Sequence, residues 1–532
     1  MAILRYTASA DNTIVNAFQP NLTTRGTGSN TGQADVLETY SIYGRQQASS
    51  SATSGSQELS RILLKFPISD ITTDRTAGKI PASGSVNFYL RVHNAETSKT
   101  VPKNYSLEIL PIAQDWQEGN GVDLENYADL TKGNIGSNWM SASNSSQWLR
   151  PDGEEIVGGS YLTGATDPQF KQDFAGGLED IEIDISPLVE HWIAGTRENH
   201  GVGIMLSSSF EAYFSASNDE GYDPYYTGSI LNNTGGATVS YYTKRFFARG
   251  TQYFFKRPVI EARWDSITRD DRGDFHFSSS LAPGPDNLNT LYLYNYVRGK
   301  LANIPAIGTT GSIMVSLYSG SADNSEPSEK LTLYNGATAV TGGYVSTGIY
   351  SCSIAVTGST SDIATLYDVW FSGSGEDPST NNIEFFTGSI ETKDFGATTD
   401  VREPVYFINI TNLQNRYSST ETARFNLYVR NKYWNPTIYT KAVETPEHIP
   451  IVSASYRVVR VLDALEAVPY GTGSESATGL SYDVSGNYFD FNMKLLEPGY
   501  EYGFKFAFYD DELSSWLEQD KIFKFRVADN EY

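Results

Sequence analysis

The sequence holds very few cysteines and histidines, and this scarcity excludes several kinds of site. Its 532 residues include one Cys, Cys352, and five His, of which no two have ligand-like spacing. A single Cys cannot form a disulfide within the chain, and it cannot supply the thiolates of a Cys-based zinc site. We therefore predict no metal site and no cofactor. We expect synthesis in a reducing compartment, or a fold that does without disulfides.

Long apolar runs and an excess of positive charge are also missing. There is no run of the roughly 18 apolar residues that a membrane helix needs, so no membrane span is predicted. The first 20 residues lack the apolar core of a signal peptide. The net charge is −24, and the one basic cluster is TKRFFARG, residues 243–250. Nucleic acid and membrane surfaces are therefore not expected as partners.

The residues that are abundant favour strands and turns. Tyr 35, Phe 26, Trp 8 and Gly 46 accompany many Ser and Thr, and short apolar runs are bounded by Gly, Asn, Ser or Pro. We predict an all-β protein of tandem β-sandwiches. A jelly-roll-like sandwich is expected at residues 1–265, followed by two smaller immunoglobulin-like sandwiches at 266–400 and 401–532. In the first block the expected strands are 11–18, 61–66, 85–92, 105–112, 179–185, 201–207 and 257–264.

Local patterns refine this expectation at three places. SRILLKFPISDI, residues 60–71, predicts a core strand that breaks at Pro67, with Arg61 and Lys65 reaching solvent or a turn. SPLVEHWIAGT, residues 186–196, predicts a short helix with Leu188, Val189 and Trp192 on one face. NLNTLYLYNYVRGKL, residues 287–301, follows a charged linker at 266–274. It predicts one long strand, with Leu291, Leu293, Asn295 and Val297 on one face and Tyr292, Tyr294 and Tyr296 on the other.

The first block resembles the DNRLRE-type β-sandwich domain. The segments that carry the resemblance are DNTIVNAFQPN (11–21), SRILLKFPISDIT (60–72), LEILPIAQDWQEG (107–119), GSNWMSASNSSQW (136–148), IDISPLVEHWIAGTRENHGVGIMLSS (183–208) and RPVIEARW (257–264). The stretches 46–58 and 209–256 depart from the pattern, and we expect extra loops there. The resemblance implies a noncatalytic domain of cell-surface and secreted proteins, some of which resemble polysaccharide-binding modules.

The whole chain resembles large virion structural proteins of contractile-tailed marine phages that infect cyanobacteria. The segments are DNLNTLYLYNYVRGKL (286–301), TGGYVSTGIYS (341–351), VPYGTGS (468–474) and LSYDVSGNYFDFNMKLLEPGYEYGFKF (480–506). This resemblance implies a protein made in the host cytoplasm and released by lysis, so that it needs neither a signal peptide nor disulfides. It implies a place in the virion at the neck, tail, baseplate, fibre or capsid surface.

Candidate chemical groups have a structural explanation that we prefer in each case. The carboxylate pairs Asp115/Glu118 and Glu182/Asp184 could serve a glycosidase only if they faced each other across a cleft. A solvated strand face explains the second pair better. Cys352 is expected in a core strand, and His191 as a partly buried helix residue. The acidic loops 217–223 and 373–379 offer oxygen ligands for calcium but lack EF-hand spacing. We predict no catalytic residue, no cofactor-binding residue and no metal ligand.

Two functions follow as hypotheses. The first is a noncatalytic structural component of a tailed phage virion, which acts through protein–protein interfaces with other virion proteins and copies of itself. The alternative is a glycan-binding adhesin or host-attachment module that binds a host surface polysaccharide. Trp116, Trp139, Trp148 and the Tyr-rich segment 222–228 could form its sugar platform. Packing of these Trp side chains against the edge of the sandwich is the competing explanation.

Overall fold

The computed structural model is mainly β, with 7% helix and 47% strand, and its antiparallel sheets include a half-barrel and a near-closed barrel. The predicted predominance of strands is therefore confirmed. The chain forms two compact units, residues 2–265 and residues 266–532. The structure describes residues 2–532 except 19–25, 46–54, 99, 123–134, 214–232, 322–325, 358–362, 364, 373–382, 394–404, 435–437, 439–447, 511–512 and 530–532.

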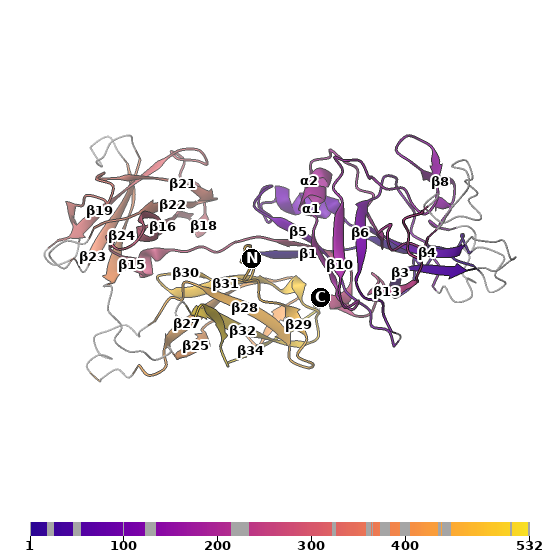
Figure 1. Ribbon diagram of the computed structural model, residues 1–532. Coiled ribbons are helices and arrows are strands. Elements are labelled where there is room, and N and C mark those ends of the chain that lie inside the picture. The colour runs from indigo at the N-terminus through magenta and orange to yellow at the C-terminus, as the bar shows by residue number, and fades with distance from the viewer. Residues whose placement is uncertain are drawn as a thin grey trace. The chain divides into compact units, whose positions relative to one another are not determined.

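Two large sheets organise the first unit (Figure 1). One has four strands in the order β1-β14-β5-β11. The other has seven, in the order β10-β6-β12-β4-β3-β13, with β2 paired to β4, and a small third sheet is β7-β8-β9. All seven strands predicted for this block are present. The strands are β1 Ile3–Thr7, β2 Ala10–Asn16, β3 Val36–Arg45, β4 Gly55–Lys65, β5 Asn87–Val92, β6 Tyr105–Pro111, β7 Ser141–Ser143, β8 Ser146–Leu149, β9 Glu155–Ile156, β10 Phe170–Phe174, β11 Ile181–Asp184, β12 Val202–Leu206, β13 Tyr241–Phe247 and β14 Val259–Arg263.

Strand β4, which contains RILLK, is buried on both faces. Ile62 and Leu64 point to one face and Leu63 to the other, because successive side chains alternate along a strand, and all three are fully buried. Leu63 belongs to a second core with Ile14, Ile112 and the tryptophans of the 116–148 region. Since both faces are covered, this strand carries an unbroken apolar run without polar alternation.

Two helices lie side by side in this unit (Figure 1), and the sequence predicted one of them. The predicted helix is α2, Ser186–Ile193, which buries Leu188, Val189 and Trp192 as expected. The other is α1, Ile68–Thr76, which follows directly on Pro67. The sequence predicted only that a strand ends at this proline. Arg75 of α1 forms a bidentate pair with Glu190 of α2, at 2.6 and 2.7 Å.

The stretch 209–256 contributes a strand, which corrects the prediction that it is an extra loop. Strand β13 lies within it and pairs antiparallel with β3, and its Phe246 is fully buried. The segment YYTKRFF holds four aromatic residues in seven, a strand-favouring composition that the loop interpretation overlooked. The predicted loop 46–58 lies mostly outside the described residues, and β4 begins at Gly55.

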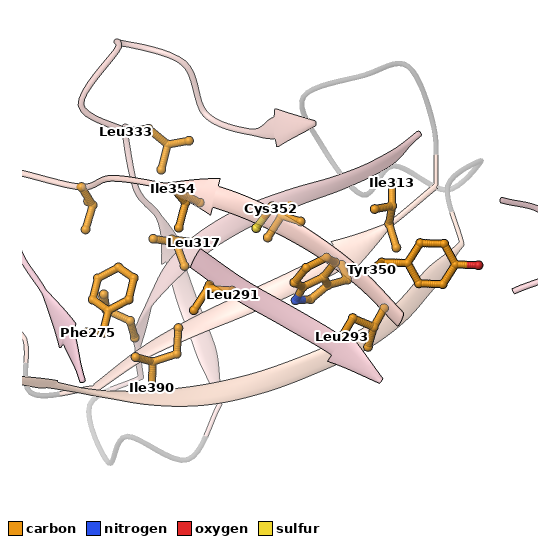
Figure 2. Packing of buried hydrophobic residues seen from close by; sticks show 14 of the residues in the cluster. Phe275, Leu291, Leu293, Ile313, Leu317, Leu333, Tyr350, Cys352, Ile354 and Ile390 are labelled. Carbon is orange, nitrogen blue, oxygen red and sulfur yellow. The ribbon is translucent and has the colours of Figure 1, made fainter. Parts of the chain in front are cut away.

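Eight strands in the first part of the second unit form one sheet, in the order β15-β24-β23-β19-β21-β22-β16, with β20 paired to β19. This sheet surrounds a single apolar core of Leu, Ile, Val, Phe and Trp side chains (Figure 2). The sequence predicted a sandwich of separate sheets here. The strands are β15 Phe275–His276, β16 Asn289–Tyr294, β19 Ile313–Gly320, β20 Pro327–Lys330, β21 Val340–Ser346, β22 Ile349–Ile354, β23 Thr365–Phe371 and β24 Glu384–Lys393.

The side chain of Asn289 connects the two ends of this sheet, β16 and β15. Its Nδ2 donates to the carbonyl oxygen of His276 at 2.9 Å, and its Oδ1 accepts from the backbone N–H of His276 at 3.0 Å. The amide thus makes the donor and acceptor pair that a neighbouring strand would make. We infer that this contact brings the sheet close to a closed barrel, where the edge strands need no other partner.

The aromatic segment 287–301 is shorter as a strand than predicted. In β16, Leu291 and Leu293 are buried while Tyr292 and Tyr294 are half-buried on the other face, as expected. Beyond Tyr294 the chain folds into a hairpin of β17, Tyr296–Val297, and β18, Lys300–Leu301. Arg298 and Gly299 both have positive φ, 51° and 77°, which is the backbone of a two-residue hairpin turn. Val297 is consequently exposed instead of continuing the core face.

The last part of the chain forms two sheets that face each other. One is β25-β27-β31-β30, and the other is β26-β34-β32-β28-β29 with β33 paired to β32. Phe425 of the first sheet packs against Phe504 of the second, with ring centroids 4.8 Å apart and the rings tilted by 60°. The strands are β25 Tyr406–Ile410, β26 Arg416–Ser418, β27 Thr422–Asn431, β28 Ala454–Arg460, β29 Glu466–Val468, β30 Ser481–Asp483, β31 Gly486–Asn492, β32 Glu501–Asp510, β33 Ser515–Glu518 and β34 Phe523–Ala528.

The charged segment 266–274, expected to be a linker, is held at both ends within the second unit. Asp270 N–H donates to the carbonyl oxygen of Tyr482 at 3.0 Å. Asp271 accepts from Tyr482 Oη at 2.6 Å and from Thr290 N–H at 2.6 Å. Arg272 pairs with Asp368, which is fully buried. These carboxylates and the guanidinium therefore have structural partners.

Replacement of Asn289 tests its role in closing the eight-stranded sheet. We expect Asn289→Ala to lower the free energy of unfolding by about 1–3 kcal/mol, because it leaves a backbone N–H and a carbonyl of His276 without partners. Urea denaturation followed by tryptophan fluorescence measures the change. The exposed Asn335, which bonds only within its own turn, provides the control Asn335→Ala. Equal stability of the two variants would contradict the assignment.

Candidate functional site

The tryptophans proposed as a sugar platform are buried. Trp139 and Trp148 have no exposed surface, and Trp116 has 6%. The indole N–H groups of Trp116 and Trp148 donate to the carbonyl oxygens of His200 and Asn138. The packing explanation is therefore right and the platform hypothesis is wrong for these three residues. The Tyr-rich segment 222–228 lies outside the described residues.

Arg61, predicted to reach solvent or a turn, is buried, so solvent is wrong, and the guanidinium instead contacts two bends of the chain. Its Nη1 donates to the carbonyl oxygen of Gly158 and its Nη2 to Glu211, both at 2.9 Å. The guanidinium carbon lies 5.5 Å from the ring centroids of Trp139 and of Tyr161. Arg61 shares a strand face with Leu63, so the tryptophan core covers it as well. Lys65 is more exposed and pairs with Asp115 at 2.6 Å, closer to expectation.

Three of the four carboxylates weighed for glycosidase chemistry form ion pairs with cations of the protein. Asp115 pairs with Lys65, whereas Glu118 pairs with Arg249 at 2.8 Å. Glu182 and Asp184 lie on the exposed face of β11, as predicted, and Glu182 pairs with Arg263 at 2.6 Å. Asp115, Glu118 and Glu182 are therefore each bound to a cation of the protein.

The basic residues of the cluster 243–250 also form contacts inside the protein. Lys244 is 3% exposed, and its Nζ donates to Asn94 Oδ1 at 2.5 Å and to the carbonyl oxygens of Gly177 and Glu179. Burial lowers the pKa of Lys244 to about 8. Arg245 pairs with Glu38 at 2.5 Å, and Arg249 pairs with Glu118. The cluster therefore stabilises the first unit and presents no continuous basic surface.

The carboxyl group of Asp11 is buried next to the ion pair of Glu118 with Arg249. It is 1% exposed, and its Oδ2 accepts from the backbone N–H of Arg249 at 2.5 Å. Burial raises its pKa to about 7, and the nearby Glu118 charge adds to the rise, while Arg249 opposes it. This carboxyl group is therefore protonated in part of the physiological pH range.

The remaining candidates are Cys352, His191 and the two acidic loops. Cys352 is buried in the core of the eight-stranded sheet (Figure 2), as expected, and burial raises the pKa of its thiol. His191 on α2 is half-buried, with Nδ1 2.8 Å from Thr196 Oγ1. The proposed calcium loop 217–223 and residues 373–379 lie outside the described residues. Within the described part of the chain, no group of three or more His, Cys, Asp or Glu residues could hold a metal ion.

An exposed aromatic pair lies on the outer face of the last six-stranded sheet. Tyr509 of β32 is directly opposite Trp516 of β33, with ring centroids 5.5 Å apart in an edge-to-face arrangement. The side chains are 37% and 38% exposed. Along β32, the even-numbered aromatics Tyr502 to Phe508 point into the core, as predicted for this strand, so Tyr509 points outward.

A row of polar side chains lies on the same face. Glu518 of β33 accepts from Lys505 Nζ at 2.5 Å and from Tyr470 Oη at 3.0 Å, and it pairs with Arg457 at 2.7 Å. The guanidinium of Arg457 also lies 5.3 Å from the ring centroid of Tyr470. We call the six residues Tyr470, Arg457, Lys505, Tyr509, Trp516 and Glu518 the Trp516 face.

The sheet around the Trp516 face is rich in basic residues. Direct cross-strand pairing places Arg416, Lys524 and Arg526 on the same side as Glu501, and all four are exposed. With Lys505 and Arg457 the outer side carries five basic residues. Among the described residues of its strands, the acidic ones on this side are Glu466, Glu501 and Glu518. This local excess of positive charge contrasts with the net charge of −24 of the whole chain.

Sequence reasoning missed the Trp516 face, although one signal for it was present. The alternation in EYGFKFAFYD assigns Lys505 and Tyr509 to the side opposite the buried phenylalanines. The pairing of β33 with β32, which brings Trp516 beside Tyr509, depends on a hairpin whose turn residues gave no clear signal.

Comparison of the chain with protein-family models and with curated proteins gives no match. The two resemblances stated from the sequence therefore remain predictions. No helix in the described ranges is long and apolar enough to cross a membrane.

Neutralising Asp11 should stabilise the protein in a pH-dependent way. Between pH 4 and 7 the folded carboxyl binds a proton that the unfolded one, with a pKa of 3.8, has lost, so stability decreases as pH rises through this range. Asp11→Asn keeps an acceptor for Arg249 N–H without a charge. We expect a gain of about 2–4 kcal/mol at pH 8 that shrinks towards pH 5. Thermal unfolding across pH, with the exposed Asp35→Asn as control, measures it; a pH-independent difference would contradict it.

Removal of the Arg61 cation should be far more damaging than removal of an exposed one. Arg61→Met leaves the 3%-exposed Glu211 without its cation, which we expect to cost about 3–5 kcal/mol. Lys65→Met, whose partner Asp115 is largely exposed, should cost less than about 1 kcal/mol. The double variant Arg61→Met/Glu211→Leu should recover part of the loss. Denaturant titration distinguishes these outcomes, and similar losses for Arg61→Met and Lys65→Met would refute the buried-pair assignment.

Proposed function

We propose that this chain is a noncatalytic structural component of a tailed phage virion that acts through protein–protein interfaces. The observation that carries the proposal is the resemblance of four segments, spread over residues 286–506, to virion structural proteins of marine cyanophages. Its partners would be other virion proteins and copies of itself. It would be made in the host cytoplasm and released by lysis. Neck, tail, baseplate, fibre and capsid-surface positions all fit.

The proposed architecture is a series of β-sandwich modules. Residues 1–265 would be a jelly-roll-like, DNRLRE-type module, supported by the two large sheets of the first unit. Residues 401–532 would be an immunoglobulin-like module, supported by two sheets that pack through Phe425, Phe489 and Phe504. Residues 266–400 would be the module between them, with the eight-stranded sheet curved around one core.

The contacts of the candidate chemical groups support a structural role. Asp115, Glu118 and Glu182 bind cations of the protein itself, and Arg61 is enclosed by the tryptophan core. The ion pair of Arg61 with Glu211 is buried, and breaking a buried pair is costly. Apolar side chains that are exposed, such as Leu281, Val297 and Leu462, are available for contacts with other proteins.

The test is to locate the chain in purified particles. We expect it to sediment with density-gradient-purified virions from the lysate in which it is expressed, in several copies per particle by quantitative mass spectrometry. Immunogold labelling with antibodies against the recombinant chain should mark one fixed position. Its presence in the lysate but absence from purified particles would overturn the proposal. So would turnover of a polysaccharide by the purified chain, measured as released reducing ends.

The alternative function, a glycan-binding module, has one favourable observation. The tryptophans that first suggested it are buried, but the Trp516 face exposes a different aromatic pair beside charged and hydroxyl groups. Such a module could equally be a part of a virion.

A further inference from the structure

We propose that the Trp516 face binds an acidic polysaccharide, that is, a polymer whose sugars carry carboxylate or sulfate groups. The proposal goes beyond the structural role and does not depend on it. It assigns a ligand class to a surface whose residues lie on β28, β32, β33 and the segment after β29.

The aromatic pair provides the apolar part of the site. Sugar rings have a C–H face that packs against the negatively polarised face of an aromatic ring, and Trp and Tyr combine such a face with a polar group at the edge. Tyr509 and Trp516 hold each other in an edge-to-face contact at 5.5 Å, so their positions are fixed before a ligand arrives. A preorganised pair loses little conformational freedom on binding.

The polar row provides hydrogen-bonding groups in a fixed arrangement. Glu518 fixes Lys505, Arg457 and Tyr470 by contacts of 2.5 to 3.0 Å. Sugar hydroxyls can donate to the carboxylate of Glu518 and accept from Lys505 and Arg457. The Nη1 and Nη2 atoms of Arg457 already pair with Glu466 and Glu518. Ala507 separates Lys505 from Tyr509 on this side of β32. Lys505 is therefore four residues, roughly 14 Å, from Tyr509 along β32, and Glu518 is two residues, roughly 7 Å, from Trp516 along β33.

The charge of the sheet selects for an anionic ligand. Arg416, Lys524 and Arg526 extend the positive charge away from Glu518, and all three are exposed. Lys524 and Arg526 are level with Gly503 and Glu501, roughly 20 and 27 Å along β32 from Tyr509. Because charges act over about 8 Å at physiological ionic strength, these cations attract the part of an extended polymer that lies beyond the aromatic pair. A neutral polymer could accept hydrogen bonds from them but would gain no charge attraction.

The distribution of apolar surface favours a polysaccharide over a protein. A stable protein interface buries on the order of 1,000 Å² or more around an apolar centre. Here the exposed apolar groups are the two aromatic rings and Leu513, which lies in the hairpin between their strands, and charged side chains lie beyond them. An open sheet face also suits an extended polymer, whereas small ligands are usually held in concave pockets.

Binding of defined polymers tests the proposal. Heparin serves as the sulfated probe, polygalacturonate as the carboxylate probe and dextran as the neutral probe, each titrated calorimetrically into the full-length chain. We expect binding of one or both anionic polymers and no binding of dextran. The two anionic probes distinguish sulfate from carboxylate recognition. Affinity should decrease as NaCl is raised from 50 to 500 mM, because exposed cations contribute to the affinity. Over this range the screening length falls from about 14 to about 4 Å.

Variants then place the site. Trp516→Ala and, separately, Tyr509→Ala should weaken binding by about tenfold or more. The double variant Lys524→Gln/Arg526→Gln should weaken it and reduce its salt dependence. Tyr433→Ala is the matched control, because this side chain is 72% exposed and follows β27 of the other sheet. All variants replace exposed side chains, and unchanged thermal unfolding will show that they are folded.

Three results would overturn the proposal. The first is absence of binding to both anionic polymers by the wild-type chain. The second is equal binding by Trp516→Ala and wild type. The third is self-association of the chain, measured by analytical ultracentrifugation, that Trp516→Ala abolishes while polymer binding stays the same; this would assign the face to a protein contact. The location of the chain in particles is measured separately, so failure here leaves the virion test intact.

Discussion

Coverage of both faces of strand β4 is the constraint on which the first unit depends. A strand projects alternate side chains to opposite sides, and β4 is apolar on both. Ile62 and Leu64 are buried on one side of the strand. Leu63, on the other side, requires a second core, which Trp116, Trp139 and Trp148 provide. Once that core covers Leu63, it also covers Arg61, two residues away. The guanidinium must then find a carboxylate and a carbonyl inside the protein, and Glu211 and Gly158 supply them.

The same constraint explains which tryptophans are available to a ligand. A sheet covered on both sides uses its aromatic residues as packing material, as in the 136–148 segment. A sheet covered on one side leaves outward aromatics exposed, as for Tyr509 and Trp516. Composition alone does not distinguish the two cases, because Trp and Tyr occur both in cores and on exposed faces. The deciding fact is whether another segment folds over the face, and this is a tertiary property.

Strand identity could be predicted well because alternation and length are local. All seven strands expected in the first block exist, and Leu291, Leu293 and the aromatics of β32 point to the side predicted. The failures arose where a short signal has two meanings. Pro67 ends a strand, but it can equally precede the first turn of a helix, and α1 follows it. Arg298-Gly299 inside an aromatic run was taken as part of a strand, whereas both residues adopt positive φ in a hairpin.

The charge pattern was harder to predict than the fold, because a sequence shows how many charges there are and not which of them are paired. The basic cluster 243–250 looked like the most cationic part of the chain, yet Lys244, Arg245 and Arg249 each have internal partners. The basic residues of the last sheet are dispersed over more than 100 residues of sequence and become neighbours only through β26, β28, β32 and β34. Pairing of distant strands thus concentrates positive charge on one face of an acidic protein. For this reason an anionic ligand can be favoured locally even though the net charge of the chain is −24.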